Sequence, residues 1–252
     1  MQSSEVSPAT AEESPGADSR WVGLFRTGAI SAAVVVLIYL FELLLVILKG
    51  PPPTTVDQWF AVLKDGRSLG ILRSFALDIA AITLLAPRNV ALYFFLRKAV
   101  GSNSALVIAL VLSLIGIAVY LASNVTFSMV SLSDQLTSAA TEAQRSQVLA
   151  AGQALMSVYN GTGPFVAFNL FAIAGILFSV LMLKSAVVPK FAAIVGIVGN
   201  AFDLGLPPEI PLFSFQVTLA LIGVGGVLVI VWNIFICATL FQRSPSSGRE
   251  QR

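Results

Sequence analysis

Residues 28–48 read GAISAAVVVLIYLFELLLVIL, and Glu42 is the only charged residue among them. A helix rises about 1.5 Å per residue, so this stretch would extend roughly 30 Å, the thickness of the hydrocarbon core of a bilayer. A run of this length and hydrophobicity is typical of a membrane-spanning helix. It predicts that the chain crosses a membrane.

Further stretches of the same kind follow, and together they predict an all-α fold, a polytopic membrane bundle with six transmembrane helices. The predicted spans are 28–48, 72–96, 104–127, 164–183, 189–206 and 215–241. Pro87 lies inside the second span, where it removes a backbone hydrogen bond, so we expect a kink near Ala86.

The composition agrees with a membrane protein and argues against several functions. Charged residues make up 11% of the chain, against about 25% in a typical soluble domain. The net charge is only +2 and its basic residues are scattered, so we expect no nucleic-acid partner. There is no histidine and one cysteine, Cys237, and neither an HExxH nor a GxSxG motif occurs. The sequence therefore predicts a non-enzymatic protein without a cofactor or metal.

The segments outside the spans differ in character. Residues 1–20 are rich in Ser, Pro, Ala and Glu and are expected to form a disordered tail, and 243–252 form a second, short tail. Between the first two spans, Val56, Trp59, Phe60 and Leu63 have helical spacing after Thr55, which predicts a short amphipathic helix on the membrane surface. Residues 141–159 predict a second helix outside the bundle, with Thr141 and Gln144 in the spacing of a capping box. Residues 160–163, NGTG, are predicted to break this helix before the fourth span.

Lysine and arginine residues predict the orientation, because cytoplasmic loops carry an excess of them. With the N-terminus in the cytoplasm, nine basic residues lie on the inner side: Arg20, Arg26, Arg97, Lys98, Lys184, Lys190, Arg243, Arg249 and Arg252. Five lie outside: Lys49, Lys64, Arg67, Arg73 and Arg145. This predicts a multi-pass protein of the cell membrane with both termini in the cytoplasm.

Four ionisable residues fall within the predicted spans, at a cost of roughly 2.5–3.5 kcal/mol each at the centre of a helix. They are Glu42, Asp78, Arg88 and Asp203, and Asn200 is added to them as part of a candidate intramembrane polar site. Counted along the helices, the three carboxylates come to a similar depth, roughly 20 Å from the inner boundary.

This common depth has two interpretations. In one, the carboxylates bind a cation or relay protons, with Arg88 as their counter-charge. In the other, which the sequence favours, each of these groups has its own hydrogen-bond partner, for example a neighbouring side chain, and the groups form no common site. An aspartyl dyad of Asp78 and Asp203 is disfavoured, because the glycine-x-glycine-aspartate element of intramembrane aspartyl proteases is missing.

The function that these observations favour is a structural or partner-interacting membrane component. The alternative is a small-solute or ion transporter that uses the intramembrane carboxylates, although the two halves show no internal repeat. The expected partners are the lipid bilayer and a second copy or another membrane protein. Small residues that would allow close helix contact are Ala192, Gly196 and Gly199, with Gly223, Gly225 and Gly226 in the last span.

Several short stretches resemble a bacterial multi-pass membrane family, domain of unknown function 4386. They are RTGA at 26–29, TEAQR at 141–145, LAAGQAL at 149–155, YNGTG at 159–163 and GIVGN at 196–200. The resemblance covers roughly residues 25–241. It implies an all-helical bundle and implies no catalytic residue.

Overall fold

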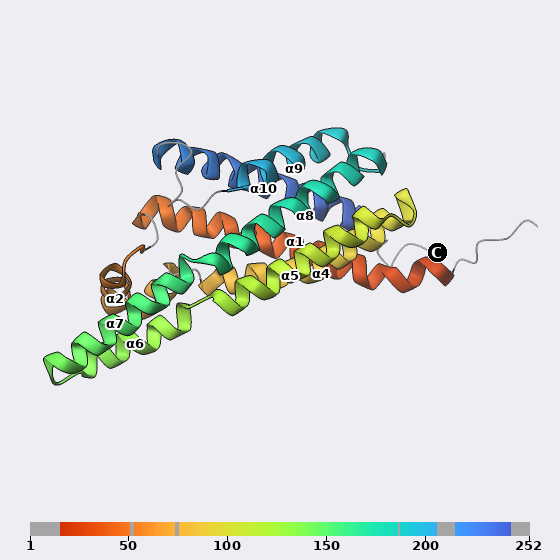
Figure 1. Ribbon diagram of the computed structural model, residues 1–252. Coiled ribbons are helices and arrows are strands. Elements are labelled where there is room, and N and C mark those ends of the chain that lie inside the picture. Colours follow the sequence, from red (N-terminus) through yellow and green to blue (C-terminus); the bar gives the residue numbers. More distant parts are fainter. Residues whose placement is uncertain (1–15, 51–52, 74–75, 186, 206–214, 243–252) are drawn as a thin grey trace, which may run out of the picture.

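The computed structural model describes residues 16–50, 53–73, 76–185, 187–205 and 215–242, which are almost entirely helical (Figure 1). The helices are α1 (Gly16–Lys49), α2 (Val56–Asp65), α3 (Arg67–Arg73), α4 (Ala76–Val100), α5 (Ser104–Ser123), α6 (Thr126–Ser138), α7 (Glu142–Tyr159), α8 (Thr162–Ser185), α9 (Lys190–Asp203) and α10 (Phe215–Gln242). The predicted all-α class is confirmed for the described residues.

Five helical stretches are long and apolar enough to cross a membrane: Trp21–Lys49, Ala76–Val100, Ser104–Ser138, Glu142–Ser185 and Gly223–Gln242. Large apolar side chains on their outer surfaces are exposed, such as Leu37 at 65% and Ile47 at 70%. Such a surface is suited to lipid. These features indicate an integral membrane protein. The predicted fifth span corresponds to α9, which has 14 residues and rises only about 21 Å.

Two predictions about the first two spans can be compared with the helices. Helix α1 begins at Gly16, so the last residues of the predicted tail are helical. The rest of that tail, residues 1–15, lies outside the described residues. Helix α4 continues as one helix through Pro87.

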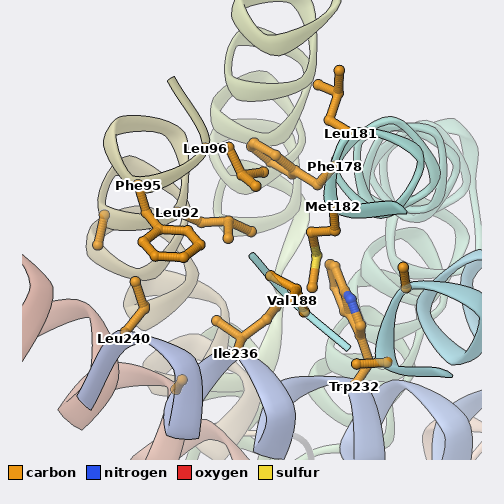
Figure 2. Close-up of a cluster of buried hydrophobic side chains, with 14 of the residues drawn as sticks. Leu92, Phe95, Leu96, Phe178, Leu181, Met182, Val188, Trp232, Ile236 and Leu240 are labelled. Atoms are coloured by element: carbon orange, nitrogen blue, oxygen red, sulfur yellow. The ribbon is translucent and has the colours of Figure 1, made fainter. Parts of the chain in front are cut away.

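One end of the bundle is closed by an apolar core. Figure 2 shows its side chains, among them Leu92, Phe95, Leu96, Phe178, Met182, Ile236 and Leu240 from α4, α8 and α10. The first half of α1 joins them, because Gly28 lets the helices approach closely: a Cβ there would lie 2.3 Å from Cβ of Ala91. The C-terminal part of α10 reaches the same place, since Leu240 also lies beside Gly28.

At the opposite end, α6 and α7 form a hairpin that extends beyond the other helices, with α2 beside it (Figure 1). We call α2, α3, α6 and α7 the cap. Trp59, Phe60 and Leu63 of α2 are buried in a core with Met129 of α6 and Met156 of α7. The prediction that α2 lies on the membrane surface is therefore wrong about its partner: the apolar face of α2 is covered by protein.

The predicted helix 141–159 is present as α7, and its capping box between Thr141 and Gln144 is confirmed. The predicted break after it consists of Asn160 and Gly161, since α8 already begins at Thr162. The helix α6 was not predicted, because Thr126–Ser138 is rich in Ser and Thr and has no long apolar run.

Helix α9 lies between α8 and α10 and uses small residues to do so. A Cβ on Gly196 would lie 2.2 Å from Oγ of Ser179 on α8, and one on Gly199 would lie 2.9 Å from Cβ of Leu228 on α10. The predicted stripe of small residues is thus confirmed as a packing face within the bundle.

Candidate functional site

Midway along the bundle, between the apolar core and the cap, α1, α4, α5, α8, α9 and α10 surround a cavity of about 280 Å³. Its polar lining consists of Tyr39, Asp78, Arg88, Asn89, Ser113, Tyr120, Asn200, Asp203, Trp232 and Asn233. Most of the remaining wall is apolar and includes the rings of Phe168, Phe171 and Phe178. Three of the four ionisable residues of the predicted spans line the cavity: Asp78, Arg88 and Asp203.

The carboxylate region of the site is built by α1, α4 and α5. The hydroxyl of Tyr120 donates a hydrogen bond of 3.0 Å to Oδ2 of Asp78. The carboxyl group of Glu42 is a direct neighbour of Asp78 and interacts with it electrostatically. Oε1 of Glu42 is buried and has no hydrogen-bond partner among the described residues. Two neighbouring carboxyl groups of this kind can share a proton.

Helix periodicity explains why Glu42 faces the bundle although most of its neighbours in the sequence face outward. Val35, Tyr39 and Glu42 are spaced i, i+4 and i+7, which places them on one side of α1. Val35 is fully buried in the core between α1, α4 and α5. Tyr39 lines the cavity together with Asp78, Arg88 and Asp203.

Arg88 is the buried cation of the site, with 5% of its surface exposed. Its Nε and Nη2 donate to Oδ1 of Asn89 at 2.9 and 2.6 Å, and its Nη1 donates to Oδ1 of Asn233 on α10. The guanidinium carbon lies 5.2 Å from the ring centre of Trp232, in the geometry of a cation–π contact. All of these partners are neutral.

Helix α9 contributes Asn200 and Asp203 to the cavity. Nδ2 of Asn200 donates to the carbonyl oxygen of Gly196 at 2.7 Å. The Asn200 amide fills the space beside Gly175 of α8, where a Cβ would lie 2.0 Å from its Oδ1. Asp203 is the last residue of α9, and Gly225 of α10 leaves room for its carboxylate, because a Cβ there would lie 2.8 Å from Oδ1 of Asp203.

Four of the five residues predicted for the site line this cavity: Asp78, Arg88, Asn200 and Asp203. The fifth, Glu42, is absent from the lining but adjoins Asp78. Arg88 forms no ion pair within 4 Å with a described carboxylate. Its predicted role as a counter-charge roughly two to three turns deeper than the carboxylates stays a prediction. Among the described residues, the ion pair within 4 Å is the distant one between Arg67 and Asp134.

Sequence reasoning missed the aromatic and amide residues that complete the site. Tyr39, Tyr120 and Trp232 were not singled out, because aromatic residues in apolar helices are usually packing residues. Asn233 of α10 joins two helices by accepting a hydrogen bond from Arg88 of α4. The adjacency of Asn89 to Arg88 in the sequence was an available signal.

The described residues contain no group of three or more His, Cys, Asp or Glu side chains that could hold a metal ion. Comparisons of the chain with protein-family models, with curated proteins and with solved structures found no match. The resemblance to domain of unknown function 4386 stays a prediction.

Proposed function

We propose that this protein is a membrane carrier for a small polar solute or ion, and that the substrate binds in the central cavity. The observation that carries the proposal is that Arg88, Asp78 and Asp203 line one cavity in the middle of the bundle. Ionisable side chains at this depth are costly and are typically retained for a substrate, ion or proton pathway.

The size of the cavity supports a small substrate. Its volume of about 280 Å³ is at the lower end of the range for ligand pockets, roughly 300–1,000 Å³. The three phenylalanine rings in its wall would suit a substrate with an apolar part as well as a polar group.

The polar contacts support a binding site over separate, internally satisfied residues. Asp78 is bonded to Tyr120, as the simpler interpretation requires. Arg88 has only neutral partners, and Asp203 makes no hydrogen bond to a described residue, so the lining retains charge that a substrate or proton can use. The role as a structural or partner-interacting component stays a prediction.

The proposal includes six spans, with both termini in the cytoplasm and α9 as a short fifth span. Two observations support an even number of crossings. The C-terminal part of α10 lies beside the N-terminal half of α1, at Gly28. Helix α9 contacts both α8 and α10 extensively, as a returning segment between them would. Basic residues lie at or near the helix ends on the side of the bundle that contains Gly28: Arg26, Arg97, Lys98, Lys184 and Lys190.

A reporter active only in the cytoplasm tests this topology. Fused at Ser19 or after Gln242 it is expected to be active, and inserted at Ala139, in the turn between α6 and α7, it is expected to be inactive. Activity at only one of the two ends would contradict the six-span arrangement.

Uptake into proteoliposomes tests the carrier function, using radiolabelled lactate, glycine and methylammonium as anionic, zwitterionic and cationic probes. We expect at least one probe to enter faster than into protein-free liposomes, and Asp203→Asn to lose that difference. The matched control is Asp57→Asn, because Asp57 is exposed on α2 and is not among the residues that line the cavity. Equal uptake of all three probes with and without protein would contradict a carrier.

A further inference from the structure

The hydrogen bonds of Arg88 leave part of its binding capacity unused. A guanidinium has five N–H donors, and three of them are directed at the oxygens of Asn89 and Asn233. Two donors therefore have no acceptor among the described residues. Because Arg88 lines the cavity, these two are in the wall where a ligand would bind.

The charge of Arg88 is also not neutralised by the protein. Amide oxygens and an aromatic ring stabilise a cation but do not cancel its charge, and no carboxylate of the described residues lies within 4 Å of it. In a low-dielectric interior, the attraction between this charge and a bound anion is much stronger than in water. An anionic group that reached Arg88 would bind with little competition from the protein's own side chains.

A second buried donor lies near Arg88. Nε1 of Trp232, which can only donate, is buried without an acceptor among the described residues. The hydroxyl of Ser179, which can donate or accept, is also buried without a partner among the described residues, and both groups lie beside Gly196 of α9. The indole N–H of Trp232 adds to the donors of Arg88 that a hydrogen-bond acceptor can use.

The acidic residues lie in a different part of the cavity. Asp78 and Arg88 are ten residues apart on α4, which separates their backbones by about 15 Å along the helix. Asp203 lies two turns after Gly196, the residue that contacts Trp232. The carboxylates therefore leave the region of Arg88 available to an anion.

We propose that the cavity binds a small organic anion, with its carboxylate on Arg88 and its apolar part against Phe168, Phe171 and Phe178. A carboxylate has two oxygens in a plane, which suits a guanidinium with two remaining N–H donors. This inference rests on the proposed carrier function and specifies its substrate class.

Thermal unfolding of the full chain in detergent tests the inference with three probes of nearly equal shape: benzoate, benzamide and benzylammonium. At a tenfold excess over its Kd, benzoate is expected to raise the Tm of the wild type by about 3–6 °C. Benzamide and benzylammonium are expected to have no comparable effect. Arg88→Gln should lose the benzoate effect, and Arg88→Lys, which keeps the charge but not the planar donors, should retain part of it.

The control is Arg97→Gln, because Arg97 is on the same helix but exposed, so the benzoate effect should persist there. A benzoate effect that survives in Arg88→Gln, or no benzoate effect in the wild type, would overturn the inference. A benzylammonium effect that Asp203→Asn abolishes would also overturn the anion class, while leaving the carrier function standing. The uptake measurement with lactate, glycine and methylammonium decides the carrier function separately.

Discussion

The cap and the central cavity each contain an arginine, but the two arginines are in opposite environments. In the cap, Arg67 binds both oxygens of Asp134 at 2.8 and 3.0 Å, and the two side chains are 62% and 56% exposed. In the cavity, Arg88 is buried and held by two asparagine oxygens and an indole ring. In the cap, this ion pair is exposed and the side chains of Trp59, Phe60 and Met129 are buried. In the bundle, Arg88 is buried and many large apolar side chains are exposed.

This difference indicates that the cap is folded in water and the bundle in lipid. The pattern in the cap is that of a protein in water, where burying Trp59 and Phe60 stabilises the fold. The pattern in the bundle suits lipid, where an outward-facing leucine costs nothing and a charge is stable only in the interior. A polar residue inside the bundle is therefore a stronger indication of function than one on the cap.

The largest effect is expected from Trp59→Ala in the cap. Trp59 is fully buried, and removing such a side chain costs about 3–5 kcal/mol of unfolding free energy. Its buried indole N–H lacks an acceptor among the described residues, so we expect the lower end of this range. Chemical unfolding followed by circular dichroism measures the loss. Val158→Ala, at an exposed position of α7, is the control and should change stability by less than about 0.5 kcal/mol.

A smaller loss is expected from Gly175→Ala in the wall of the cavity. The added Cβ would lie 2.0 Å from Oδ1 of Asn200, and overpacking of this kind costs about 1–3 kcal/mol. The higher helix propensity of alanine, about 1 kcal/mol, offsets only part of this cost. The same unfolding measurement applies. Gly223→Ala meets nothing within 4 Å and should be neutral or stabilising, so equal losses in both variants would contradict the assigned contact.

The smallest effect is expected from Arg67→Ala, which breaks the exposed ion pair with Asp134. Exposed pairs contribute about 0.2–1 kcal/mol and are screened by salt. The difference from the wild type should shrink between low and high ionic strength. A loss above about 2 kcal/mol, independent of salt, would mean that the cap depends on this pair more than its exposure indicates.

The sequence predicted the helices better than their partners. Apolar length located the six helices of the bundle, although α1 begins twelve residues before the predicted first span. The capping pattern at Thr141 located α7. The packing of α2 against α6 was not predictable, because the sequence of α6 has no apolar run that indicates a helix with a buried face. The same apolar face of Trp59 and Phe60 would suit lipid or protein equally well.

For the site, the cost of charge in lipid was enough to select Asp78, Arg88 and Asp203 from the sequence. What the sequence could not show is the rotation of each helix about its axis, which decides contacts between helices. It therefore missed Tyr120 as the donor to Asp78 and Asn233 of α10 as an acceptor for Arg88.

The central claim is that water-filled polar space lies inside an apolar bundle, and the reactivity of a cysteine in the cavity tests it most directly. Gly226 lines the cavity and Gly223 is exposed on the same helix, and an added Cβ meets nothing within 4 Å at either position. In a Cys237→Ser background in liposomes, a water-soluble methanethiosulfonate reagent needs a thiolate, which forms only where water reaches the thiol. We predict that Gly226→Cys is modified and that Gly223→Cys, facing lipid, is not. Modification of Gly223→Cys but not Gly226→Cys, or of neither, would contradict the account.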